Sequence, residues 1–98
     1  NNTKIEANET LILEEYKARS NILSTENKIK EIYELLIDLE DKNRINKDVM
    51  IDAQKRLDKV RDNFNLSYNY FNNKDYLKAK ETAIQFKKDA KEIIRTLD

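Results

Sequence analysis

Apolar side chains recur every three or four residues over most of the chain, which is the spacing of one face of an α-helix. The clearest row lies between about Lys47 and Asn72 and consists of Leu57, Val60, Phe64, Tyr68 and Phe71. Within it, Phe64 to Tyr70 also alternates apolar and polar residues, as a half-buried strand does. The helical row is longer and no partner strand occurs elsewhere, so the spacing predicts a helix.

A second row with the same spacing predicts another helix, from about Lys74 to Leu97. Its members are Tyr76, Ala79, Ala83, Phe86, Ala90, Ile93 and Leu97. Asn72 and Asn73 lie between the two rows, and Asn tolerates the left-handed backbone of a helix end. We therefore expect a tight antiparallel hairpin, in which the small Ala side chains let the last helix approach its neighbours closely.

The first 45 residues fit either one helix or two. Thr3 and Glu6 match a capping box, and Asn43 to Asn46 predicts a turn in which Asn46 caps the next helix. Between them runs a heptad frame without a stutter: Leu11, Ala18, Ile22, Ile29, Ile32, Leu36 and Leu39. This frame is compatible with a single helix of about 40 residues.

The segment Ser20 to Thr25 offers a break, with Asn21 ending one helix and Ser24 capping another. Without the break, the first helix would overhang the hairpin by roughly 20 Å. Four apolar side chains would then be exposed: Ile5, Leu11, Ile12 and Tyr16. We therefore predict the break and an all-α, up-down-up-down antiparallel four-helix bundle. The alternative is three helices with a first helix of about 40 residues.

The amino-acid composition supports the all-helical prediction and limits the kinds of partner that the chain is expected to bind. The 98 residues fit one domain, residues 1–98, and the Asn at position 1 suggests a piece excised from a longer chain. There is no Gly and no Pro, and nineteen basic residues balance nineteen acidic ones. The balanced charge gives no reason to expect nucleic acid, because the last helix carries acidic residues beside its basic strip of Lys80, Lys87, Lys91 and Arg95.

Without His or Cys, the usual general base, thiolate nucleophile and transition-metal ligands are missing. Glu31 and Glu34 share a helix face, but a di-iron bundle also needs Glu-x-x-His pairs. We therefore predict no enzyme, no catalytic, cofactor or metal-binding residues, and no cofactor. The longest uncharged run, Asn63 to Asn73, is too short to cross a bilayer, so we also predict that this segment does not insert into a membrane.

One surface stands out as a candidate for contact with a partner. Leu66 and Tyr70 lie off the main apolar row, on a face otherwise formed by Asn63, Asn69 and Asn73. Tyr beside Asn suits an adaptable protein-binding surface. A small ligand between the helices is a further hypothesis, with a pocket near Tyr33, Tyr68 and Tyr76.

The turn of the last hairpin carries a family resemblance. The run Phe71-Asn72-Asn73-Lys74-Asp75-Tyr76-Leu77-Lys78-Ala79, followed by Ala83, is similar to the Gly-Asp-Tyr-x-x-Ala turn of prokaryotic helical hairpins. Such turns occur in cell-envelope proteins of archaea and in the spectrin-like repeats of bacterial septation-ring regulators. The Gly of that pattern is replaced here by Asn73 or Lys74. The resemblance implies the helical extracellular domain of an archaeal membrane or cell-surface protein.

Together these features predict a non-catalytic helical bundle that acts through its surface. We expect an extracytoplasmic interaction or sensing module of a membrane-anchored or surface protein, located outside the cell or in its envelope, with a protein partner. The alternative is a cytoplasmic spectrin-like or coiled-coil structural segment. The segment around residues 20–25 separates the two, because a continuous first helix favours a dimer of the chain with itself.

Overall fold

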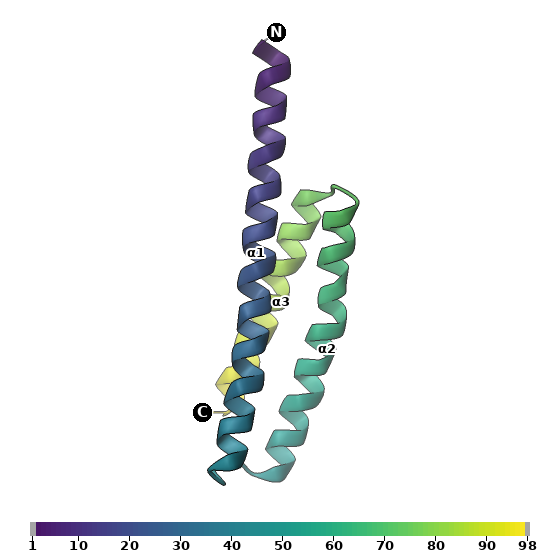
Figure 1. Cartoon of the computed structure of the whole chain (residues 1–98). Helices are drawn as coiled ribbons and strands as arrows, with labels where there is room; N and C mark the ends of the chain where they lie inside the picture. The colour runs from purple at the N-terminus through teal and green to yellow at the C-terminus, as the bar shows by residue number, and fades with distance from the viewer. Residues whose placement is uncertain (1, 98) are drawn as a thin grey trace.

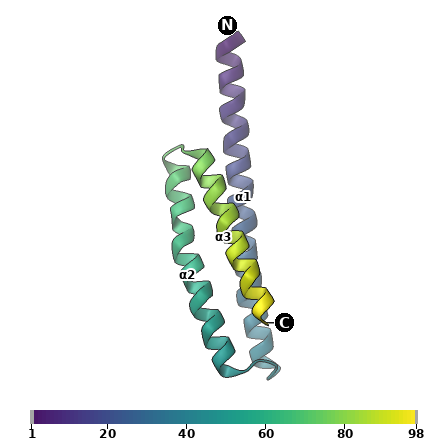
Figure 2. The ribbon, with the colours of Figure 1, turned by 180° about the vertical axis from the view of Figure 1, so that it is seen from behind.

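A computed structural model describes residues 2–97, with side chains from Thr10 to Leu97, and this part of the chain forms three α-helices. They are α1 (Asn2–Asp41), α2 (Lys47–Asn72) and α3 (Tyr76–Leu97). α1 and α3 run in the same direction and α2 runs opposite to both (Figures 1 and 2). The all-α class and the hairpin of α2 and α3 are confirmed, and no strand occurs within the described residues.

The predicted four-helix bundle is wrong, because α1 is one continuous helix of 40 residues. The expected break is absorbed by side-chain hydrogen bonds inside the helix. Asn21 Nδ2 donates to the carbonyl of Lys17 at 2.8 Å, and Thr25 Oγ1 donates to the carbonyl of Asn21 at 2.9 Å. Ser24 does not cap a new helix, since its hydroxyl accepts a hydrogen bond from Lys87 of α3. The three-helix alternative describes the fold.

Buried apolar side chains from all three helices form one core: Ala18, Ile22, Ile29, Ile32, Leu36, Ala53, Leu57, Val60, Phe64, Ala79, Ala83, Ala90 and Ile93. α3 packs closely along both α1 and α2, which contact each other less. Ala79, Ala83 and Ala90 are fully buried, so this close approach depends on their small size. Most of the predicted heptad frame of α1 is therefore core, whereas Leu11 at its start is exposed.

Two hydroxyl contacts set the position of α3 along the axes of α1 and α2. Thr25 Oγ1 of α1 lies 2.7 Å from the carbonyl oxygen of Ala83, and the Ser67 and Thr82 hydroxyls lie 2.7 Å apart between α2 and α3. Thr25 and Ser67 are fully buried. A shift of α3 by one turn would break both contacts between helices, so they favour the observed alignment of the three helices.

Both connections close with the same backbone motif. After α1, the amide of Arg44 bonds to the carbonyl of Leu39, and after α2 the amide of Asp75 bonds to that of Tyr70, each at 2.9 Å. The residue before each donor has a positive φ, 52° at Asn43 and 64° at Lys74. The left-handed residue of the hairpin is therefore Lys74, and not Asn72 or Asn73 as expected.

The start of α2 follows the prediction. Asn46 is its N-cap, and the Asn46 side chain accepts a hydrogen bond of 2.8 Å from the amide of Asp48. α3 begins at Tyr76, two residues later than expected, because Lys74 turns the chain and Asp75 precedes the helix. The Asp75 carboxylate accepts from the amide of Lys78 at 3.4 Å.

α1 extends past the tip of the hairpin (Figure 1). The Arg19 guanidinium lies 5.7 Å over the ring of Phe71, near the end of α2, so the helix before Arg19 projects by about 20 Å. We call residues 2–16 the α1 overhang. The molecule measures 64 × 18 × 16 Å, and its radius of gyration of 17.1 Å exceeds the ~13 Å of a compact domain of this length.

Candidate protein-contact surface

The described side chains of the α1 overhang include four exposed large apolar residues: Leu11, Ile12, Leu13 and Tyr16. The exposure of these side chains was the reason for predicting a break in the first helix, and in the structure they are exposed. Of the residues expected to be exposed in that case, Ile5 lies outside the part of the chain whose side chains are described. The overhang is therefore a candidate for contact with another molecule.

The exposed apolar residues of α1 continue beyond the overhang in one row. Ile12, Tyr16, Leu23 and Ile37 are 66%, 70%, 55% and 58% exposed. They belong to a set spaced alternately by four and three residues, which we call the outer stripe: Ile12, Tyr16, Arg19, Leu23, Glu26, Lys30, Tyr33 and Ile37. This is a second heptad frame, on a different face of α1 from the one that forms the core.

The part of the outer stripe from Leu23 to Ile37 borders an open groove of about 570 Å³. The groove lies along α1 and its lining includes Ile29 and Tyr33. The Tyr33 hydroxyl donates to the Asp58 carboxylate of α2 at 2.8 Å, which holds the ring at the edge of the groove. The groove is therefore lined by apolar and charged side chains of α1, among which Tyr33 is held in place by α2.

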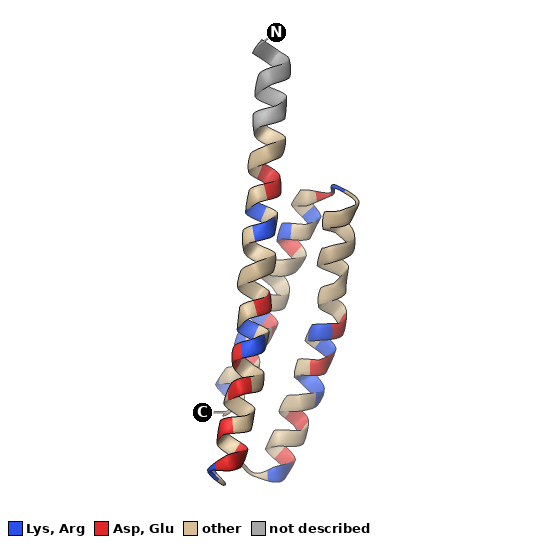
Figure 3. Ribbon diagram, viewed as in Figure 1, with Lys and Arg blue, Asp and Glu red and all other residues tan. Residues whose placement is uncertain are grey.

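The contact patch expected on α2 is largely exposed. Leu66 is 42% exposed, Asn63, Asn69 and Asn73 are exposed, and Tyr70 is partly buried against the core. Lys78 Nζ lies 5.6 Å from the centre of the Tyr70 ring. The end of α2 at the hairpin turn, from Asn63 to Asn72, carries no charged residue (Figure 3). The patch is thus an uncharged surface with a single large, well-exposed apolar side chain, Leu66.

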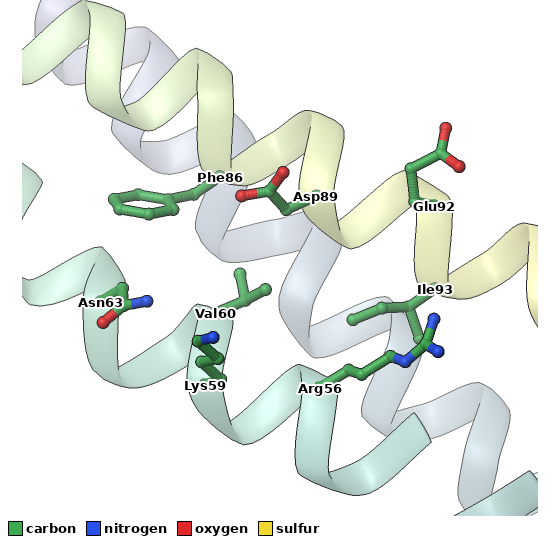
Figure 4. A pocket seen from close by; sticks show the side chains of 8 residues that line it. All are labelled: Arg56, Lys59, Val60, Asn63, Phe86, Asp89, Glu92 and Ile93. Atoms are coloured by element: carbon green, nitrogen blue, oxygen red, sulfur yellow. The ribbon is translucent and has the colours of Figure 1, made fainter. Parts of the chain in front are cut away.

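A groove of about 280 Å³ lies between α2 and α3. In Figure 4, Val60 and Ile93 point toward each other across it, with Arg56 on one side and Glu92 on the other. Arg56 is paired with Asp52 at 3.0 Å and Glu92 with Arg95 at 3.1 Å, each within its own helix. Lys59 and Asp89 also line the groove, and the Asp89 carboxylate accepts a hydrogen bond of 3.1 Å from Gln85. The groove therefore has an apolar floor and charged residues of both signs at its edges.

The three tyrosines expected near a ligand pocket are held in separate contacts. Tyr33 is bonded to Asp58, Tyr68 to the side chain of Glu26, and the Tyr76 ring packs edge-on against Phe71 at 5.3 Å. Burial and the hydrogen bond to Glu26 raise the pKa of Tyr68 to about 12. Burial and the Asp58 carboxylate also raise the pKa of Tyr33. The groove along α1 is lined by Tyr33 and by neither of the other two.

The charged residues are mixed in sign over the described surface (Figure 3). Three ion pairs with i to i+4 spacing join described residues: Glu15 with Arg19, Asp38 with Lys42, and Asp52 with Arg56, at 3.0 to 3.1 Å. All three are exposed, so each contributes little to stability. Lys87, from the basic strip of α3, is partly buried and bonded to Ser24, and is thus removed from that strip.

The described residues bring together no group of three His, Cys, Asp or Glu that could hold a metal ion. Among the helices described, none has the length and apolar character needed to cross a membrane. No protein-family model, curated protein or solved structure matches the chain. The candidate site is therefore defined by its own geometry alone.

The outer stripe is the feature that the sequence reasoning missed. Its spacing was present in the sequence, but the core frame from Leu11 to Leu39 explained most of the apolar residues of α1. As a result, no periodic set of residues was assigned to Ile12, Tyr16 and Leu23. A search for a second frame at another angle around the same helix would have found them.

Proposed function

We propose that this chain is a non-catalytic helical module that works by binding protein through the exposed apolar face of α1. The observation that carries the proposal is the projection of α1 past the hairpin with Ile12 and Tyr16 largely exposed. Exposing such side chains to water is unfavourable by about 25 cal/mol per Å² of apolar surface, and a bound protein would remove that cost.

Two settings fit such a module, and the continuous α1 favours one of them. A spectrin-like or coiled-coil structural segment has a long helix that makes contacts beyond its own bundle, which α1 resembles. An extracytoplasmic interaction or sensing module of a membrane-anchored or surface protein is the second setting. It is supported by the resemblance of the turn from Lys74 to Ala79 to those of archaeal cell-envelope proteins. Protein binding is common to both.

Site-specific photo-cross-linking in cells that express the protein tests the proposal. A benzophenone amino acid at Ile12 should give protein adducts, because the side chain would lie inside the contact. The same amino acid at Leu66 tests the patch on α2, and at the exposed Lys55 of α2 it reports random encounters. Adducts at Ile12 no more abundant than at Lys55 would show that the overhang is not a protein-contact surface.

A further inference from the structure

Lys87 of α3 is a partly buried cation whose hydrogen-bond partner is neutral. Its ammonium donates a hydrogen bond to the Ser24 hydroxyl of α1. The ion pairs that join described residues do not include Lys87. Withdrawing a charge from water is unfavourable unless an opposite charge or hydrogen bonds compensate it. An anion bound beside Lys87 would therefore gain a favourable interaction with this charge.

Lys87 and Ser24 line a groove of about 390 Å³ between α3 and α1. The rest of its lining comes from α1 and consists of Ser20, Leu23, Asn27, Lys28 and Glu31. Serine hydroxyls, the asparagine amide and lysine ammonium groups all donate hydrogen bonds. Five donor side chains from two helices therefore line one groove, and such a set of donors suits an anion with several acceptor oxygens.

Glu31 is the acidic residue of this lining, and it pairs with Lys28 at 2.9 Å. The Glu31 side chain is 62% exposed, whereas that of Lys28 is 23% exposed. An ion pair with an exposed partner contributes little to stability, so an anion in the groove can compete with Glu31 for Lys28. Once Glu31 is displaced, the groove offers two ammonium groups to the anion.

The charged residues of α3 are divided between its two neighbouring helices. Lys80 and Lys91, seven residues before and four residues after Lys87, share its helix face. The acidic residues of α3 have other spacings, and Asp89 and Glu92 line the groove on the opposite side of α3, with α2 (Figure 4). The side of α3 that faces α1 is therefore more basic than the sequence of α3 as a whole indicates.

A phosphate monoester matches the groove in charge and in hydrogen bonding. It carries about −1.5 to −2 charges at pH 7 and three strong acceptor oxygens, so it can engage both ammonium groups at once. The Ser24 hydroxyl accepts from Lys87 and can donate its own hydrogen to the anion. Leu23 is 55% exposed and offers an apolar contact to the organic part of the ester.

We infer that the groove between α1 and α3 binds a phosphate monoester through Lys87, Lys28 and Ser24. The inference goes beyond the proposed function, because it concerns the side of α1 that faces α3 and a small anionic group rather than a protein.

Titration of the purified, isotope-labelled chain with phenyl phosphate, followed by NMR at constant ionic strength, tests the site. We expect saturable shifts of the amide signals of Ser24, Lys28 and Lys87, with a dissociation constant of about 10 mM or lower. Phthalate, an aromatic dianion with carboxylates in place of the phosphate, is the control for charge. It should bind at least about threefold more weakly, because its oxygens are divided between two separate groups.

Three substitutions separate the groove from the general charge of the surface. Lys87→Gln should raise the dissociation constant at least about tenfold, because it removes a charge-assisted hydrogen bond. Lys88→Gln removes the same charge from the neighbouring, exposed residue and should change the constant less than about threefold. Glu31→Gln should lower it about threefold, because Lys28 loses its competing carboxylate. Circular dichroism should show the helical content of the parent chain in all three variants.

Phosphate monoesters occur on small molecules and, as phosphatidic acid, in membranes. Sedimentation with phosphatidylcholine vesicles that contain phosphatidic acid distinguishes these sources. Phenyl phosphate binding without sedimentation would assign the groove to a small molecule. Sedimentation that Lys87→Gln abolishes and Lys88→Gln preserves would assign it to the lipid headgroup.

Three outcomes overturn the inference. Shifts that do not saturate with phenyl phosphate, in a chain that also does not sediment with the vesicles, would show that the groove binds no phosphate monoester. Equal effects of Lys87→Gln and Lys88→Gln would show attraction to the general surface charge, and equal binding of phthalate would show no preference for phosphate. The adducts at Ile12 test the proposed function separately, so either idea can fail while the other stands.

Discussion

At the scale of single residues, Lys74 has the least favourable backbone conformation among the described residues of the hairpin turn. Its φ of 64° lies in the left-handed region, where a residue with a Cβ is disfavoured by about 1–2 kcal/mol. The other left-handed residue, Asn43, is of a type that tolerates this region. Lys74 also occupies the position directly before Asp75-Tyr76, where the similar prokaryotic turns have Gly. The backbone geometry at residue 74 gives a physical reason for that Gly.

We predict that Lys74→Gly stabilises the chain by about 1 kcal/mol, because Gly adopts a positive φ without steric cost. The matched control is Asn73→Gly, at a residue with φ of −86°, where Gly only adds freedom to the unfolded chain and should not stabilise. Urea unfolding followed by circular dichroism measures both, with the slope unchanged. Equal effects of the two substitutions would contradict the role assigned to Lys74.

The raised pKa of Tyr68 predicts how the free energy of unfolding changes at alkaline pH. Its pKa is raised from 10.0 to about 12, so the folded chain holds the phenolic proton more tightly than the unfolded chain does. The resulting stabilisation is complete below pH 10 and is lost as the pH rises through 10 toward 12. We expect the urea midpoint of the parent chain to fall more steeply over this interval than that of Tyr68→Phe. Parallel pH profiles would show that Tyr68 does not titrate in this way.

At the scale of elements, α2 and the α2–α3 hairpin could be predicted from the sequence because a single row of apolar residues identifies each helix. The sequence did not decide whether α1 is one helix or two. Asn21, Ser24 and Thr25 have side chains that cap a helix or bond within one, and their local sequence fits both. The choice is made by α3, which supplies the Ala83 carbonyl to Thr25 and the Lys87 ammonium to Ser24. The contact patch on α2 was expected from the sequence, whereas the spacing of the outer stripe, although present in the sequence, was hidden by the core frame of α1.

The continuity of α1 predicts a distance. Spin labels at the exposed residues Lys17 and Glu40, introduced as Cys variants, should lie about 35 Å apart, since 23 residues of helix rise by that amount. A chain that folded back at residues 20–25 would bring the labels to about 20 Å. Double electron–electron resonance separates the two values. The measurement belongs at low protein concentration, where distances between copies do not contribute.

At the scale of the whole molecule, the three helices form one bundle in which α1 is much longer than α2 and α3. α3 is covered on two sides by α1 and α2, whereas α1 has a core face and the outer stripe. Part of the outer stripe contacts α2 as well, since Arg19 lies over the Phe71 ring and Tyr33 bonds to Asp58. Other members of the stripe stay largely exposed: Ile12, Tyr16, Leu23 and Ile37. These exposed side chains are the ones that the proposed protein contact would cover.

Solution scattering tests whether copies of the chain associate with each other, which a continuous first helix favours. Two copies whose α1 helices overlap along their whole length would keep the longest dimension close to 64 Å while the mass doubles from 11.7 kDa. Two copies joined only at the tips of their overhangs would instead measure about 110 Å. Because one exposed helix face offers little contact area, we expect a dimer that dissociates on dilution. Small-angle scattering across a hundredfold range of concentration, paired with light scattering, measures length and mass together. A mass that stays at 11.7 kDa over the whole range would contradict self-association and would leave a different protein as the partner of the exposed face.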